Sequence, residues 1–487
     1  MKARLIPSLL SFVTILFTGC MVGPNYVKPS TPMAPAFKEQ ASAPSQANDG
    51  WKLAQPGDQT ARGNWWEIYG DPQLNALEAQ IDSTNQTLKI AEANYREARA
   101  AIRFSRSAEA PTIGTAPSIS TVRDSAKQPY FPSSQVNNGS GDFVLPADLS
   151  WEIDLWGRIR RSVTAAKEQA QASAADMAAA QLSLQAELAY DYFELRSADA
   201  EKKLLDDTVR AYSKALGLTD NRFEGGAAPK SDVAQARTQL QDAQVLDTDI
   251  MVQRSEYEHA IAILIGKPPA NFSLPPSPID LHTPAIPAIP QVLPSELLER
   301  RPDIAASERR VAAANEQIGI AQAAYYPTLN LSALAGFEGT SATNWLNWPS
   351  RFWAVGPSFS ETLFDAGRRR ATKESAIATY DGNVANYRQT TLTAFQQVED
   401  NLAVLRILDG ESQQQHSATA AAEEALRIFM NRYAGGVDTY LQVVTSQTTA
   451  LSNEQNDIDI RRRQLDASVL LIKALGGDWN VDKLPKV

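Results

Sequence analysis

Two stretches of this chain join a short alternating segment directly to a very long helical one, and this join limits the folds open to it. Residues 145–155 alternate between apolar and polar side chains, which is the period-two pattern of a strand with one apolar and one polar face. After Gly157, residues 158–223 contain no proline and are predicted to form one continuous helix. The same succession recurs before and after Gly367. A strand followed by a very long helix, twice in one chain, predicts an elongated molecule.

The two halves of the chain are copies of each other in register. Landmark residues recur at a constant offset of about 210 residues, the self-similarity expected of an internal repeat. The matched landmarks are Gly157 with Gly367, Asn221-Arg222-Phe223 with Asn431-Arg432-Tyr433, Gly225-Gly226 with Gly435-Gly436, and Gly266 with Gly476. In each half, a strand hairpin precedes a long helix, a glycine turn and a return helix. The shorter helices of each half, placed end to end, are predicted to match the length of the long one.

These patterns divide the chain into six segments. They are a signal peptide (1–19), a lipidated N-terminal tether (20–64), a first repeat (65–266) with its hairpin at 112–155, a proline-rich connector (267–294), a second repeat (295–477) with its hairpin at 328–364, and a C-terminal tail (478–487). The tether is rich in Pro, Ala, Ser and Gln and is predicted to be extended, so that the body stands off the anchor.

Composition argues against nucleic-acid binding and against catalysis. The chain has 46 basic and 56 acidic residues, which gives no basic surface for nucleic acid. Its three histidines, His259, His282 and His416, lie far apart beside no plausible metal partners. It has no glycine-rich phosphate loop and no nucleophile elbow. We therefore predict no metal, no catalytic residue, no cofactor and no enzymatic activity.

The N-terminus predicts export and lipidation. Lys2 and Arg4 precede an apolar run over residues 5–17, which is typical of a signal peptide and too short for a membrane-spanning helix. Cys20, the only cysteine, follows Thr18-Gly19 at the cleavage point. A lone exported cysteine is a free thiol, an intermolecular bridge or a lipid acceptor, and its position favours the last. The segment resembles bacterial lipoproteins, which implies diacylglycerol and palmitate on Cys20. Met21 in place of aspartate implies the outer membrane.

The strands predict an α+β membrane protein rather than a soluble one. Four strands of about ten residues have the length to cross a bilayer when tilted. They cannot close alone, because an open sheet leaves unpaired edges in lipid, so several chains must pool their strands. A soluble β-sandwich on a coiled-coil stalk is the alternative, but sandwich strands come in a regular run of about seven. The polar face predicted to line water comprises Asp148, Ser150, Glu152, Asp154, Asn330 and Ser332.

Several longer motifs carry a resemblance to one family. They are Cys20-Met21-Val22-Gly23-Pro24-Asn25-Tyr26, Asp71-Pro72-Gln73-Leu74, and residues 293–304 continued by Ile318-Gly319 and Tyr326-Pro327. Over nearly the whole mature chain the sequence resembles the TolC-like outer-membrane efflux proteins, in particular their NodT-type lipoprotein branch. The resemblance implies a homotrimer with a twelve-stranded outer-membrane β-barrel, four strands from each chain, continued by a helical barrel across the periplasm. It also implies a periplasmic membrane-fusion adaptor and an inner-membrane RND-type pump.

The function implied is passive conduction of drugs or other toxic small molecules from that pump to the outside. By position in the family, the periplasmic gate and adaptor contact would comprise Arg222, Gly225, Gly226, Asp232, Arg432, Gly435, Gly436 and Asp438. Our hypothesis is that the two aspartates set the electrostatics of the mouth, while the two arginines pair across helices and hold it closed. The alternatives are an exit duct of a type I protein secretion system and a structural surface fibre.

Two arginine clusters begin the long helices, where the helix macrodipole disfavours cations. They are Arg158, Arg160 and Arg161, and Arg368, Arg369 and Arg370. Contact with lipid phosphates at the membrane boundary and plain solvation are both consistent with the sequence.

Overall fold

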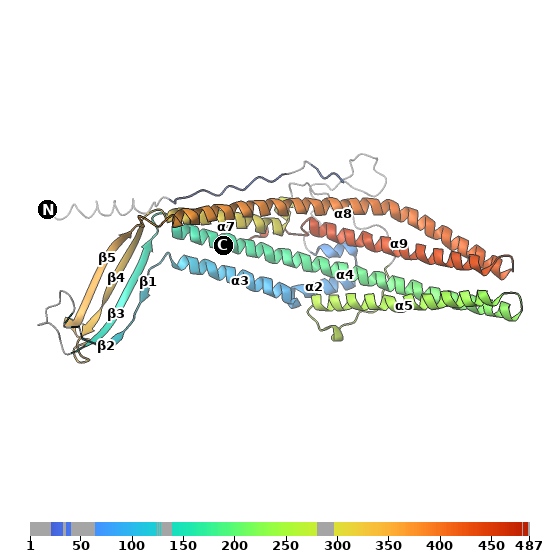
Figure 1. The fold of residues 1–487 in the computed structure, drawn as a ribbon, viewed down its shortest axis with the longest axis horizontal. Helices are drawn as coiled ribbons and strands as arrows, with labels where there is room; N and C mark the ends of the chain where they lie inside the picture. The colour runs from blue at the N-terminus through green and yellow to red at the C-terminus, as the bar shows by residue number, and fades with distance from the viewer. Residues whose placement is uncertain are drawn as a thin grey trace.

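The computed structural model describes residues 21–32, 36–39, 64–123, 125, 127, 139–279, 297–479 and 481–485. An antiparallel sheet lies at one end of the elongated chain, and long helices extend from it to the other (Figure 1). The predicted signal peptide, the lipidation site Cys20, most of the first hairpin loop and most of the proline-rich connector lie outside the described residues.

Two helices of equal length run through most of the molecule. α4 (Arg158–Glu224) and α8 (Arg368–Ala434) have 67 residues each, which is about 100 Å at 1.5 Å per residue. Each begins after a glycine with positive φ, +80° at Gly157 and +89° at Gly367, because the turn out of the strand needs a left-handed residue. Both helices end within one residue of the predicted position.

The shorter helices lie along the long ones as the length match predicted. α3 (Gln86–Ser107) and α5 (Lys230–Leu264) follow one another along α4, and α7 (Pro302–Ala323) and α9 (Tyr440–Ala474) do the same along α8 (Figure 1). α7 and α9 also pack on α4, which joins the two repeats into one bundle. The smaller elements are η1 (Trp65–Tyr69), α2 (Pro72–Thr84), η3 (Pro269–Asn271), α6 (Leu297–Arg300), η5 (Trp348–Ser350) and η6 (Val481–Lys483).

The sheet places the two predicted hairpins side by side. β1 (Thr112–Gly114) and β2 (Ser118–Val122) pair with β3 (Ser140–Ile153), β3 pairs with β4 (Thr328–Gly339), and β4 pairs with β5 (Arg351–Ser360). The first strand was predicted as one piece over residues 112–122. It is interrupted at residues 115–117, where Pro117 has no N–H to donate to the ladder.

The largest hydrophobic core lies midway along α4, where η1 and α2 dock on it. Its fully buried members include Trp65, Leu74, Ile81, Leu188 and Leu195. Asp71 starts α2 by accepting the amide N–H groups of Gln73 and Leu74 through its carboxylate, as an N-cap residue does. Among the described helices, none combines the length and the apolar character that crossing a bilayer requires.

Candidate functional site

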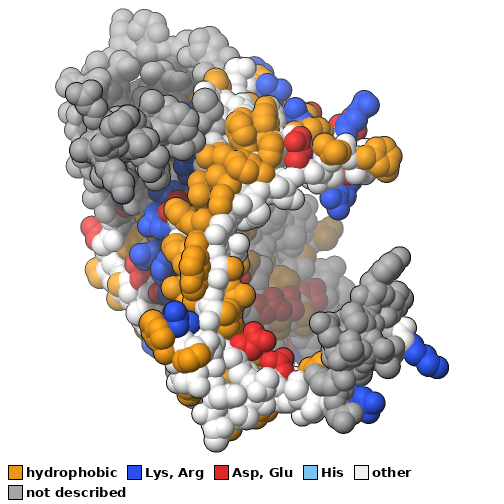
Figure 2. Space-filling model, turned by 90° about the vertical axis from the view of Figure 1, so that its left-hand side faces the viewer, with side chains coloured by type: hydrophobic (Ala, Val, Ile, Leu, Met, Phe, Trp, Pro, Cys, Tyr) orange, Lys and Arg blue, Asp and Glu red, His pale blue; other side chains and the backbone are white. Residues whose placement is uncertain are grey.

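The sheet brings the predicted polar residues onto one face. Ser150 lies opposite Ser332, and Glu152 lies opposite Asn330, in the β3–β4 register. Asp148 shares this face, although its partner on β4 is Leu334, and Asp154 follows the last residue of β3. Viewed from the sheet end, hydrophobic side chains form a band over the sheet and acidic side chains lie in the hollow beside it (Figure 2). The strands thus have the two faces that their alternation predicted.

The opposite face of the sheet is apolar and open. Trp353, Val355 and Phe359 alternate along β5 and are 74%, 63% and 70% exposed. Within the described residues, the outer edges of β5 and of β1 and β2 pair with no further strand. One chain therefore presents an apolar surface and two unpaired edges, which need other copies or another environment to cover them.

The glycine turns lie together at the far end of the bundle (Figure 1). Gly225 and Gly435 end α4 and α8, and Gly226 and Gly436 have φ angles of +69° and +76°. The amide of each second glycine donates to the carbonyl three residues earlier, at 2.9 Å in both turns. These glycines cap their helices, and the two turns have one geometry.

Arg222 crosses from the first turn to the second. Its guanidinium donates to the carbonyl oxygens of Tyr433 and Ala434, at 2.7 and 3.0 Å, and lies over the Tyr433 ring at 4.7 Å from the centroid. A cation at the C-terminus of α8 satisfies carbonyl groups that have no partner within the helix. Of the two arginines predicted to pair across helices, Arg222 therefore makes such a contact within a single chain.

Arg432 does not cross between the repeats, which corrects half of our hypothesis. It donates through Nη2 to Asp438 at 3.1 Å, within its own turn. The guanidinium of Arg432 holds the pKa of the Asp438 carboxyl below its ordinary value. At the same offset, the first repeat has Ala228 in place of Asp438. Because Arg222 has no carboxylate at position 228 to pair with, it reaches the other repeat instead. Comparing residues 228 and 438 in the sequence reveals this difference between the repeats.

Aromatic residues missed by the sequence reasoning pack the two turns together. Tyr433 and Tyr440 meet edge to face with centroids 5.1 Å apart, and Ala236 of α5 belongs to the same buried cluster. Burial, with smaller effects from Tyr433 and Asp232, raises the pKa of Tyr440 to about 12. Asp232 is therefore placed beside this cluster, one turn inside the tip, as predicted from its position in α5.

The arginine clusters at the start of the long helices are paired within the chain. Neither lipid phosphate nor plain solvation is needed to account for the paired members. The pairs are Arg158 with Glu152, Arg160 with Asp154, Arg161 with Glu316, Arg369 with Asp365, and Arg370 with Glu374. Carboxylates that precede each helix offset the unfavourable macrodipole there. Two carboxylates of the predicted water-lining set, Glu152 and Asp154, are among these partners.

Arg161 also holds the segment that follows Cys20. Its side chain is 1% exposed and donates to the Val22 and Pro24 carbonyl oxygens at 2.6 and 3.2 Å, and to the Glu316 carboxylate at 2.7 Å. Close approach requires Gly319, because a Cβ there would lie 2.3 Å from the Arg161 side chain. The N-terminal segment is extended, as predicted, but it lies against the helices rather than clear of them.

A second contact holds the same segment lower on the bundle. Phe37 is buried against Phe395 with ring centroids 6.4 Å apart, and the amides of Lys38 and Glu39 donate to the Glu399 carboxylate at 2.6 and 2.9 Å. We call residues 21–39, where described, the N-terminal strap. The composition of the strap, without apolar periodicity, gave no signal for this docking.

The described part of the chain holds no cluster of side chains suited to a metal centre. Among the described residues, no group of three or more His, Cys, Asp or Glu side chains converges to hold a metal ion. His416 lies 3.3 Å from the Asp457 carboxylate, an exposed contact between α8 and α9. The described chain has a sheet with one polar face at one end and two glycine turns joined by Arg222 at the other.

Known proteins share this arrangement. The profile of the outer membrane efflux protein family matches residues 77–267 and 293–477. The toluene efflux pump outer membrane protein TtgF of Pseudomonas putida is 30% identical over 484 residues, 97% of each chain. The antibiotic efflux pump outer membrane protein ArpC, also of Pseudomonas putida, is 30% identical over 479 residues, 97% of this chain and 96% of that one. The solved structure of the outer-membrane channel OprN superimposes with a TM-score of 0.86 at 30% identity, covering 94% of this chain and 100% of that one.

The chain belongs to the outer membrane efflux protein family. It is an outer-membrane channel component of an efflux system, with its sheet at the membrane and its helices in the periplasm. This confirms the family, fold and location that the sequence motifs implied.

Proposed function

We propose that three copies of this chain form a continuous duct that conducts small toxic molecules passively from an inner-membrane pump to the outside. A periplasmic membrane-fusion adaptor connects the duct to a pump of the RND class. Two relatives are named for toluene and antibiotic efflux, which supports apolar solvents and drugs as the exported class. The duct itself catalyses no reaction.

The open sheet carries the proposal. β1 and β2 pair along the same edge of β3, so the sheet of one chain has four strand positions, which are too few to close a barrel. When three chains join, the unpaired edges of β5 and of β1 and β2 complete a twelve-stranded cylinder. Its exposed apolar face would then contact lipid and its polar face would line water. The helices reach about 100 Å from this sheet, far enough to meet a partner well inside the periplasm.

The paired turns are the proposed gate and adaptor contact. Arg222 links the two repeats at this end, and Arg432 neutralises Asp438 in the second turn. Asp232 is a further acidic group there, repeated three times in the trimer. Opening the mouth would require the Arg222 contact to break, so this residue restrains the closed state.

Lipid on Cys20 is the proposed anchor. The Arg161 contact holds Val22 next to the start of α4, which brings the chain to the junction of sheet and helices two residues after the proposed lipidation site. Several acyl chains give firm attachment, because each buried methylene contributes about 0.8 kcal/mol.

Single-channel recording tests the proposal. The purified full-length chain, added to a planar lipid bilayer, should insert as a trimer and give discrete conductance steps. Arg222→Met should raise the open probability, whereas Arg427→Met, which removes an exposed arginine of α8 paired with Glu424, should not. A monomer without conductance, or equal behaviour of the two variants, would contradict the proposed duct or the proposed restraint respectively.

An exit duct for type I protein secretion remains the second candidate. It shares the architecture but predicts an ABC transporter as the inner-membrane partner. Cross-linking in cells, with the photoreactive group placed at Val437 in the exposed second turn, distinguishes the two by the adaptor and pump recovered.

A further inference from the structure

A groove runs between α5 and α9 over the midpoint of α4, away from both the tip and the sheet. We propose that this groove binds organic cations, that is, amines or quaternary ammonium compounds with an apolar part. The inference rests on the proposed conduction of small molecules and names one chemical class of them.

The groove consists of two adjoining cavities. The first has a volume of about 370 Å³ and the second about 290 Å³, and both are lined by Glu201 and Gln253. Gln455 of α9 donates to the Glu201 carboxylate at 3.0 Å, so α9 closes the groove opposite α5. Volumes of this size suit a small organic molecule rather than a single ion.

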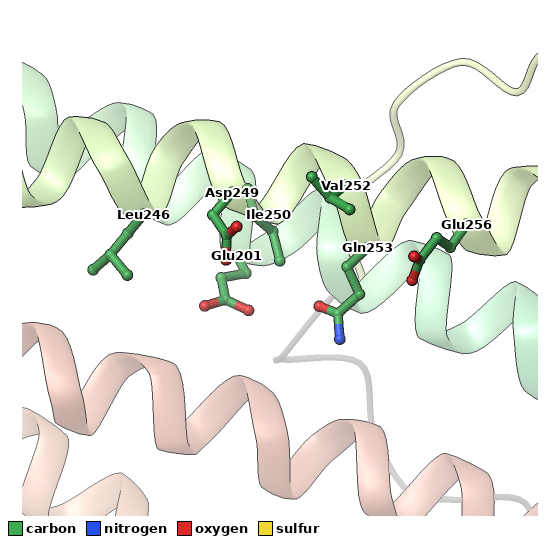
Figure 3. A pocket seen from close by; sticks show the side chains of 7 residues that line it. All are labelled: Glu201, Leu246, Asp249, Ile250, Val252, Gln253 and Glu256. Carbon is green, nitrogen blue, oxygen red and sulfur yellow. The ribbon is translucent and has the colours of Figure 1, made fainter.

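The first cavity combines acidic and apolar side chains. Glu201, Asp249 and Glu256 supply its carboxylates, while Leu246, Ile250 and Val252 supply apolar surface. Figure 3 shows Glu201 of α4 directed toward the same space as Asp249 and Gln253 of α5. Leu246 and Val252 are exposed, so an apolar guest would cover surface that water otherwise contacts.

The second cavity contains a buried hydroxyl group that lacks a partner. Ser197 of α4 lines the cavity and is 4% exposed, and its Oγ forms no hydrogen bond with the described residues. Buried polar groups are nearly always paired, and the Ser197 hydroxyl is available to accept an N–H of an ammonium guest in this cavity. Tyr190 and Tyr257 line the same cavity, and aromatic rings attract cations through their faces.

The charge of the lining favours a cation. Among the described residues, five carboxylates line the two cavities, and Arg462 is the one lining cation. Arg462 pairs with Glu194 and Asp459 of the lining, while no hydrogen bond or ion pair from the described residues reaches Asp249 or Glu256. Burial, followed by the charge of Glu194, raises the pKa of the neighbouring Asp466 carboxyl.

An organic cation fits this groove better than a metal ion. Ca²⁺ and Mg²⁺ need six or more oxygen ligands that converge within about 2.5 Å, and the described carboxylates do not converge in that way. An ammonium group interacts with carboxylates and rings over longer distances, and its alkyl or aryl part would contact Leu246 and Val252.

Isothermal titration calorimetry of the purified trimer tests the assignment, with benzyltrimethylammonium as the cation and benzenesulfonate as a probe of similar size and opposite charge. The cation should bind saturably and the anion should not. Glu201→Gln with Asp249→Asn should weaken binding of the cation at least tenfold. Glu256→Gln removes a single exposed carboxylate that has no hydrogen-bond or ion-pair partner among the described residues. It should weaken binding as well and guards against misfolding of the double variant.

The matched control is Asp242→Asn. Asp242 lies two turns from Asp249 on the same helix and is exposed, but it does not line either cavity. It removes an equal charge and should leave binding unchanged. Equal weakening by Asp242→Asn would show a diffuse negative field instead of a site, and binding of the anion, or no saturable binding of the cation, would overturn the inference.

Conductance separates failure of the site from failure of the duct. Wild-type chains that conduct but do not bind the cation would refute this site and leave the proposed conduit intact. Chains that bind the cation in the expected way but do not conduct would contradict the conduit alone.

Discussion

Arg161 is the position where a single substitution should release the N-terminal strap. Arg161→Met keeps much of the side-chain volume but removes the ion pair with Glu316 and two hydrogen bonds to strap carbonyl oxygens. Glu316 would then be an uncompensated buried carboxylate, at 7% exposure. Removing one partner of a buried pair typically costs about 3–5 kcal/mol, so we expect the strap to open on the order of 10²- to 10⁴-fold more often.

Cleavage by chymotrypsin after Tyr26 measures strap opening. The Tyr26 hydroxyl donates to the Glu308 carboxylate, so the bond is protected while the strap is docked. Arg161→Met should accelerate the cut sharply, and adding Glu316→Gln should restore part of the protection because no buried charge remains. Both chains should keep their helical circular dichroism.

Arg370→Met is the matched control. Its partner is Glu374, and the two side chains are 82% and 63% exposed. An exposed helical pair of this kind contributes little to stability, so cleavage after Tyr26 should stay at the wild-type rate. If Arg161→Met were cut no faster than this control, the strap would not depend on the buried pair, and our reading of Arg161 would be wrong.

Four further substitutions have clear expected outcomes. Gly319→Ala should destabilise the chain, because the added Cβ would lie 2.3 Å from the Arg161 side chain. Gly410→Ala on α8, which has open space around it, should stabilise the chain by up to about 1 kcal/mol. Thermal unfolding midpoints that shift in opposite directions would support this pair of predictions. Burial, then the charge of Asp82, raises the pKa of the Glu78 carboxyl to about 9. The protonated carboxyl therefore favours folding at low pH, and this contribution to stability is lost as the pH rises from the ordinary pKa of a glutamate through 9. The stability of Glu78→Gln relative to the wild type should therefore increase as the pH rises. A difference in unfolding midpoint that stays constant with pH would contradict the raised pKa of Glu78. Ala228→Asp supplies the acid that the first turn lacks, and should draw Arg222 from the α8 carbonyls and raise single-channel open probability; unchanged gating would count against the crossing contact as a restraint.

The order and length of the elements follow from local signals in the sequence. Glycines that adopt positive φ stand at the start of α4 and α8 and just after their ends, and absence of proline allows each helix to continue. The alternation along β3 and β4 also determined which residues share a face, since successive strand residues point to opposite sides. Such features depend on neighbours in sequence, so these local signals gave the ends of α4 and α8 to within a residue.

Contacts between distant residues were decided only by the tertiary structure. The β3–β4 register, the crossing of Arg222 to the second turn and the docking of the strap on Arg161 join residues more than a hundred positions apart. Spacing cannot reveal them, because the partner of a buried arginine depends on which carboxylate or carbonyl the packing brings within about 3 Å. The sequence thus determined the shape of each repeat, and the meeting of the two repeats decided which charged groups hold them together.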